Sequence, residues 1–141
     1  MSDLNESLIS EAFHLLLFSV GGICFGVDTG QVAEIAVYEG EICEDLFWFH
    51  EEMGYAGKMV TYQSPVIVTI KTGTASSYRV IIDSMEDIAE FSQSDISLFP
   101  SMLEPFVLQK GLWGLLQRQA RLVLLLDFQR LLREKSACTS T

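Results

Sequence analysis

Residues 13–35 read FHLLLFSVGGICFGVDTGQVAEI, and this stretch decides the fold of the 141-residue chain. Residues 13–20 form an apolar run with no polar alternation, which is typical of a strand buried on both faces. Gly21 and Gly22 then form the two-residue signal of a tight hairpin turn, and residues 23–27 form the returning strand. The chain is therefore predicted to open with a β-hairpin.

The segment after this hairpin predicts a turn and a third strand. Gly26 lies inside the second strand, where glycine is typical of a bulge or a sharp bend. Residues 28–31, DTGQ, predict a turn in which Asp28 or Thr29 caps backbone amides. Residues 32–38, VAEIAVY, predict another strand or a very short helix. Short elements at this spacing are typical of small barrels or sandwiches.

A similar pattern returns later in the chain. FGVDTGQVAEI at residues 25–35 and VIIDSMEDIAEF at residues 80–91 both pass from an aliphatic run through an aspartate to an alanine-glutamate pair. The aspartates are Asp28 and Asp83, and the second copy has one residue more between its aspartate and its glutamate. We interpret the recurrence as two related β units packed in one molecule. Chance similarity over so few positions is the alternative.

The rest of the chain extends the β pattern within one domain. Asp127 is predicted to cap a final helix, FQRLLREK, and residues 39–64 predict either an aromatic strand or one helical turn. We expect an all-β domain at residues 12–135 with flexible tails at residues 1–11 and 136–141. Further strands are predicted at PVIVTIK (65–71), YRVIID (78–83), LWGLLQ (112–117) and RLVLLL (121–126).

Charge is unevenly distributed along the chain, whose net charge is −10. Residues 1–57 carry eleven acids and no Lys or Arg, whereas the remaining residues carry eight acids and nine bases. An acidic front is repelled by phosphate and by anionic lipid, so nucleic acid and membrane surfaces are poor partners. A basic patch on another protein is a plausible partner. The alternative is that the acids only keep an apolar protein soluble.

No targeting or membrane segment is expected. The apolar runs are far shorter than the roughly 18 residues that span a bilayer, and the N-terminal stretch lacks the basic region of a signal peptide. The cysteines are Cys24, Cys43 and Cys138, and none forms a C-x-x-C pair. Free thiols in a reducing cytoplasm are the simplest explanation, so a cytoplasmic protein is predicted.

One candidate for covalent chemistry is a thiol centre. Cys24 lies on the strand next to His14 across the glycine turn, and Glu34 is the one group that offers itself to orient the imidazole. Such a set is typical of a small thiol hydrolase. The alternative is that Cys24 is a buried structural thiol.

The remaining chemical signals have structural alternatives. His50 beside Glu51 and Glu52 resembles a general base with its partner, or else a solvated acidic face. The aromatic run FWF at residues 47–49 is either a stacking platform or core packing. Neither histidine has a ligand-spaced partner, so no metal site is predicted. No phosphate-binding glycine loop occurs, and no cofactor is expected.

The ordered segments resemble the CheW-type chemotaxis coupling domain. In that family an aromatic-Gly-aliphatic-Asp segment precedes Val-x-Glu-Ile, and these are residues 25–28 and 32–35 here. Residues 78–100 are similar to the family's second aliphatic-aliphatic-Asp strand with its acidic continuation. Residues 112–132 are similar to its closing hairpin and final leucine-rich helix.

The resemblance implies both a fold and a function. The implied fold is two intertwined SH3-like five-stranded barrels related by a pseudo-twofold axis, with a short C-terminal helix. The implied function is that of a non-enzymatic adaptor in bacterial chemotaxis. Such adaptors join the cytoplasmic tip of a chemoreceptor to the regulatory domain of a histidine kinase, and the receptor tip docks in the apolar groove between the barrels.

The resemblance also implies which residues form that groove. Glu34 is the sharpest candidate, because a charge between apolar neighbours needs a reason. For the aliphatic positions, ordinary barrel core is the alternative. The first wall is assigned to Thr29, Val32, Glu34 and Ile35, and the second wall to Val80 and Ile82.

Residues 37–64 depart from the family pattern. The family has an Asn-Leu-Arg-Gly turn followed by a proline-containing strand, and neither occurs here. The stretch is short by about ten residues. Since a bidentate arginine is hard to replace, a second hypothesis stays open: a divergent docking or decoy module that no longer couples the kinase.

Overall fold

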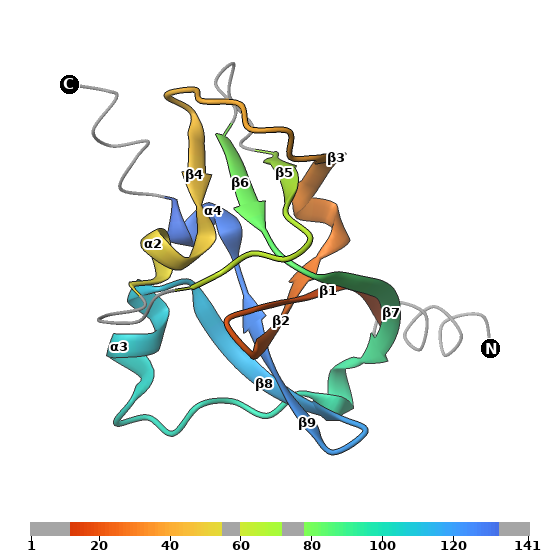
Figure 1. The fold of residues 1–141 in the computed structure, drawn as a ribbon. Helices are drawn as coiled ribbons and strands as arrows, with labels where there is room; N and C mark the ends of the chain where they lie inside the picture. The colour runs from red at the N-terminus through yellow and green to blue at the C-terminus, as the bar shows by residue number, and fades with distance from the viewer. Residues whose placement is uncertain (1–11, 55–59, 72–77, 133–141) are drawn as a thin grey trace.

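A computed structural model describes residues 12–54, 60–71 and 78–132 (Figure 1). Its strands are β1 (Ala12–Val20), β2 (Ile23–Asp28), β3 (Val32–Val37), β4 (Leu46–Trp48), β5 (Val66–Ile70), β6 (Tyr78–Ile82), β7 (Met85–Ser92), β8 (Leu112–Arg118) and β9 (Arg121–Leu126). Its short helices are η1 (Thr29–Gln31), α2 (Phe49–Met53), η2 (Gln93–Asp95), α3 (Glu104–Gln109) and α4 (Phe128–Leu131). The predicted all-β class is confirmed. No helix in the described ranges is long and apolar enough to cross a membrane.

The strands form two sheets that exchange chain segments. One sheet has the order β7-β1-β2-β9-β8, and the other has the order β3-β5-β6-β4. The chain passes from the first sheet to the second between β2 and β3, and it returns between β6 and β7. The two sheets are therefore intertwined.

The predicted opening hairpin is present as β1 and β2. Val20 pairs with Ile23, and the turn between them has positive φ angles, 61° at Gly21 and 85° at Gly22. Glycine adopts this left-handed backbone without a steric penalty. Of the bulge or sharp bend predicted at Gly26, the bulge is absent, because both neighbouring strands pair through this residue without a register shift. A Cβ there would lie 3.2 Å from Val123 Cγ1, so this glycine lets neighbouring side chains approach closely.

The two sheets contain the related units that the sequence repeat predicted. β1, β2, β9 and β7 correspond to β5, β6, β4 and β3, because β2 pairs in parallel with β9 just as β6 pairs in parallel with β4. β9 and β4 are each followed by a short helix whose first residue is a fully buried phenylalanine, Phe128 in α4 and Phe49 in α2. Asp28 and Asp83 stand where β2 and β6 leave their sheets.

The second unit is one strand smaller than the first. β8 pairs with β9 at the edge of the first sheet, and in the described residues no strand takes the corresponding place beside β4. Residues 38–45, which connect β3 to β4, form no strand. The second sheet thus has four described strands where the family resemblance implied five.

Two apolar clusters fill the molecule. The smaller one is formed by buried side chains of the first sheet and includes Leu15, Leu17 and Cys24. The larger one lies between the sheets and contains stacked and edge-on phenylalanines; the Phe25 and Phe49 ring centroids are 4.8 Å apart. Of the two hypotheses for the FWF run, core packing rather than a stacking platform is therefore the one that applies to Phe49. The larger cluster comprises Leu16, Phe18, Val20, Phe25, Val27, Phe49, Val68, Ile70, Tyr78, Val80, Ile82, Leu112, Leu126, Phe128, Leu131 and Leu132.

Candidate partner-binding face

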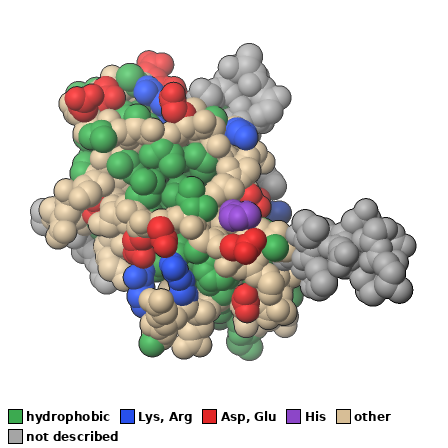
Figure 2. Space-filling model, turned by 90° about the vertical axis from the view of Figure 1, so that its right-hand side faces the viewer, with side chains coloured by type: hydrophobic (Ala, Val, Ile, Leu, Met, Phe, Trp, Pro, Cys, Tyr) green, Lys and Arg blue, Asp and Glu red, His purple; other side chains and the backbone are tan. Residues whose placement is uncertain are grey.

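Two exposed edge strands lie on one side of the molecule. β3 and β7 each end a sheet, and most of their residues are exposed. Figure 2 shows this side, where hydrophobic side chains gather into one patch with charged groups around it. The large apolar side chains that these strands expose are Ile35 (37%), Val37 (68%), Met85 (42%) and Ile88 (57%). We call this surface the β3/β7 face.

Ion pairs border the β3/β7 face along β7. Arg121 binds Glu86 at 2.7 Å, and Arg118 binds Asp87 at 3.2 Å. These contacts connect β7 with the β8–β9 hairpin, and Figure 2 shows acidic and basic side chains together below the apolar patch. An apolar centre with a polar rim is typical of protein-binding surfaces.

Side-chain hydrogen bonds fix the approach to β3. The Asp28 carboxylate accepts a bond from Gly30 N at 2.7 Å, as the turn prediction required. The Gln31 side chain spans the interface with α4: its Nε2 donates to Asp127 Oδ1 at 3.0 Å, and its Oε1 accepts from Phe128 N at 2.7 Å. Asp127 also accepts from Arg130 N, which confirms it as the helix cap. These hydrogen bonds therefore fix the turn from which β3 begins.

The residues predicted for the first wall of the groove lie in the turn before β3 and on β3 itself. Thr29 and Val32 are half-buried, and Val32 packs against the larger core cluster. Glu34 and Ile35 are exposed on β3. Because neighbouring side chains of a strand point to opposite faces, Ile35 shares its face with Val37 rather than with Glu34.

The second predicted wall does not reach the surface. Val80 and Ile82 on β6 are fully buried in the larger core cluster. They offer no contact area to a partner, so the core alternative holds at both positions. Instead, Met85 and Ile88 on β7 are the exposed apolar residues on the second side. The repeat carried a signal for Ile88, since it aligns with Val32.

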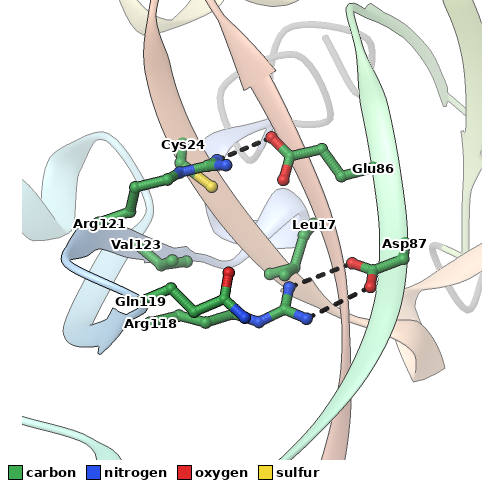
Figure 3. Close-up of a pocket in the computed structure, with 8 residues that line it drawn as sticks. All are labelled: Leu17, Cys24, Glu86, Asp87, Arg118, Gln119, Arg121 and Val123. Carbon is green, nitrogen blue, oxygen red and sulfur yellow. Dashed lines mark hydrogen bonds and ion pairs between the residues drawn. The ribbon is translucent and has the colours of Figure 1, made fainter.

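A cavity of about 200 Å³ opens beside the ion pairs (Figure 3). Cys24 lies on its wall near the Arg121 guanidinium. Burial raises the pKa of the Cys24 thiol above its ordinary value, and the charge and hydrogen bond of Arg121 offset only part of the rise. A buried, protonated thiol is a weak nucleophile. The lining residues are Leu17, Cys24, Glu86, Asp87, Arg118, Gln119, Arg121 and Val123.

The predicted thiol centre is not assembled. Cys24 pairs with Ser19, whereas His14 lies five positions further along β1, which corresponds to about 17 Å. His14 instead faces Glu90 on β7 at 3.8 Å. Glu34 belongs to the other sheet. These three groups therefore cannot act as one catalytic set.

His50 makes a structural contact on α2. Its backbone N donates to the Tyr62 hydroxyl at 3.1 Å, and its Nδ1 lies 3.0 Å from the same oxygen. Burial raises the pKa of Tyr62 to about 12. Within the described ranges, no three His, Cys, Asp or Glu side chains group as metal ligands would.

Comparisons with known proteins address the fold. No family model and no curated protein matches the sequence. The crystal structure of the scaffolding protein TtCheW from Thermoanaerobacter tengcongensis matches with a TM-score of 0.66, covering 85% of this chain and 92% of that chain. This chain has a CheW-like fold. The two sequences share 14% identity, so the match concerns the fold.

Proposed function

We propose that this CheW-like chain is a non-enzymatic cytoplasmic scaffold of chemotaxis-type signal transduction. It joins the cytoplasmic tip of a chemoreceptor to the regulatory domain of a histidine kinase through protein–protein contacts. The similarity of its fold to a CheW scaffolding protein supports this role. We also propose that this scaffold needs no cofactor, as the sequence resemblance implies.

The observation that carries the proposal is the exposed apolar β3/β7 face. Soluble proteins seldom leave several large aliphatic side chains together in water without a binding role. The apolar stripe of a receptor helix fits such a surface, with anchors repeating along one side of the helix. We assign Ile35, Val37, Met85 and Ile88 as its contacts, with Thr29, Val32 and Glu34 at its margin.

Calorimetric titration with a helical hairpin of a receptor tip tests this assignment. The parent chain is expected to bind with a Kd on the order of micromolar. Ile88→Lys places a charge in the apolar patch and should weaken binding at least about tenfold.

Met102→Lys is the matched control for this titration. Met102 is exposed two residues before α3, and α3 lies across the molecule from β7 in Figure 1. The control should bind as the parent does. Equal affinities for the parent and both variants would remove the β3/β7 face from the proposal.

A second candidate is a docking or decoy module that binds a receptor without coupling the kinase. The four-stranded second sheet favours it, because residues 38–45 hold no counterpart of β8. A pull-down with a purified kinase regulatory domain separates the two candidates. Micromolar retention of the kinase domain supports coupling, whereas receptor binding without kinase binding supports the decoy.

A further inference from the structure

The outer edge of β3 has backbone groups that bond to no other strand in the described part of the chain. Among the described strands β3 pairs with β5 alone, and Tyr38 N donates to Pro65 O at the end of this ladder. Because hydrogen-bonding direction alternates along an antiparallel strand, Glu34 and Ala36 face β5, whereas Ile35 and Val37 direct their N–H and C=O groups away from it. No other described residue bonds to these two outward-facing backbones.

The corresponding strand β7 is protected in ways that β3 is not. Carboxylates of β7 are engaged by Arg118, Arg121 and His14. β3 contains no lysine and no proline, the residues that commonly block an exposed edge. Its bulge lies between Val32 and Glu34, before the two outward-facing positions. β3 is thus an edge at which another strand can add.

The charge around this edge selects the strand that fits. Glu34 on β3 is exposed, as are Glu39, Glu41 and Glu44 in the following segment, and no Lys or Arg occurs in the described residues before Lys71. Asp45 is partly buried and is bound by Arg79. Lys71 lies at the opposite end of β3, where its N–H binds Gln31 O. A partner segment with Lys or Arg beside Glu34 gains electrostatic attraction, and apolar residues between its bases can contact Ile35 and Val37.

We propose that the outer edge of β3 binds an extended, basic segment of a partner protein by strand addition. Backbone bonds at Ile35 and Val37 hold the added strand, and alternating basic and aliphatic side chains specify it. This inference goes beyond the scaffold proposal, which needs only side-chain contacts on the β3/β7 face. A partner can therefore use both the face and the edge.

Fluorescence anisotropy with a labelled Lys-Val-Lys-Val-Lys peptide tests the proposal. Ile35→Pro removes an outward N–H, and proline is tolerated at an edge position of this kind. Ile35→Ala removes the same side chain but keeps the N–H. We expect Ile35→Pro to weaken peptide binding about tenfold relative to Ile35→Ala, since one backbone bond is lost and the partner carbonyl is left without a donor.

A second peptide keeps the test valid if Ile35→Pro does not fold. The same sequence with an N-methyl group on every residue has the same charge and cannot donate a backbone hydrogen bond along either edge. It should bind the parent chain at least about tenfold more weakly than the unmodified peptide. Equal binding of the two peptides would overturn strand addition, as would equal binding by the Ile35 variants or no peptide binding at all.

The receptor-tip titration distinguishes this inference from the scaffold proposal. Peptide binding without receptor-tip binding leaves strand addition standing and removes the scaffold assignment. Receptor-tip binding without peptide binding does the reverse. Circular dichroism of each variant verifies that the β structure is retained.

Discussion

The two halves of the fold differ where their edges meet solvent. In the first half β8 extends the sheet, and arginines of the β8–β9 hairpin bind the acids of β7. In the second half residues 38–45 supply no such strand, and β3 is exposed along nearly its whole length. Both halves therefore bury equivalent core residues, whereas the second half, which has one strand fewer, leaves the edge strand β3 exposed to a partner.

The largest expected effect tests whether the halves are equivalent in the core. Phe49 and Phe128 occupy matching positions and are both fully buried. Replacing either by alanine removes a packed ring and leaves a cavity, so each variant should lose about 3–5 kcal/mol of unfolding free energy. Urea unfolding followed by tryptophan fluorescence measures the loss.

Phe106→Ala provides the control for this pair. Its ring is mostly exposed on α3, and its removal should cost less than about 0.5 kcal/mol. A Phe49→Ala variant as stable as this control would break the equivalence of the two halves.

A smaller effect is expected at the two aspartate turns, and here the halves should differ. Asp83 is buried and accepts bonds from Gln63 N and Ser64 N, the latter at 2.6 Å. Asp28 accepts one exposed bond from Gly30 N. Asp83→Ala should therefore cost about 2 kcal/mol and Asp28→Ala about 1 kcal/mol, measured by the same unfolding assay. An equal cost at both turns would show that the second corner is no more tightly held than the first.

Cys24 tests whether the first half is sealed beneath its ion pairs. Its raised pKa keeps the thiol protonated at neutral pH, because burial disfavours the thiolate. Iodoacetamide labelling should be slow near pH 7 and should accelerate only in more alkaline solution, with the exposed Cys43 as an internal reference. Mass spectrometry of the two peptides gives both rates. Rapid stoichiometric labelling of Cys24 at neutral pH would show instead that the thiol is reactive and not sealed beneath the ion pairs.

The smallest expected effect concerns the ion pairs of the two halves. Arg121 pairs with Glu86 in the first half, and Arg79 pairs with Asp45 in the second at 3.0 Å. These groups are partly exposed, so Arg121→Met and Arg79→Met should each lower the unfolding free energy only slightly, and less again in high salt. A much larger loss at Arg121 would mean that the ion pairs hold the first sheet together rather than only bordering its face.

The parts of the fold that the sequence predicted are those with strong local signals. Gly21 and Gly22 sit between two apolar runs, so the hairpin needed no tertiary information. The repeat around Asp28 and Asp83 predicted two related units, because the same corner chemistry occurs where each strand leaves its sheet. Residues 38–45 gave no such signal: the stretch is acidic, and the absence of a strand there became visible only in the assembled sheet.

The candidate site was predicted less completely, for a physical reason. Val80 and Ile82 lie on the face of β6 that packs into the larger core cluster between the sheets. The alternation of side chains along a strand does not reveal whether another sheet covers that face. Met85 and Ile88 were missed because their exposure depends on β7 being an edge strand. Ion pairs such as Arg121 with Glu86 join residues distant in sequence, and only the topology brings them together.

The central claim is that a protein partner binds the β3/β7 face, to which the two exposed edge strands contribute. Two-dimensional amide NMR of the labelled chain, titrated with a receptor-tip hairpin, tests it most directly. The account predicts shifted resonances along both strands, including Ile35 and Ile88, while α3 stays unperturbed. Shifts confined to α3 or to the β8–β9 hairpin, with β3 and β7 unchanged, would contradict it.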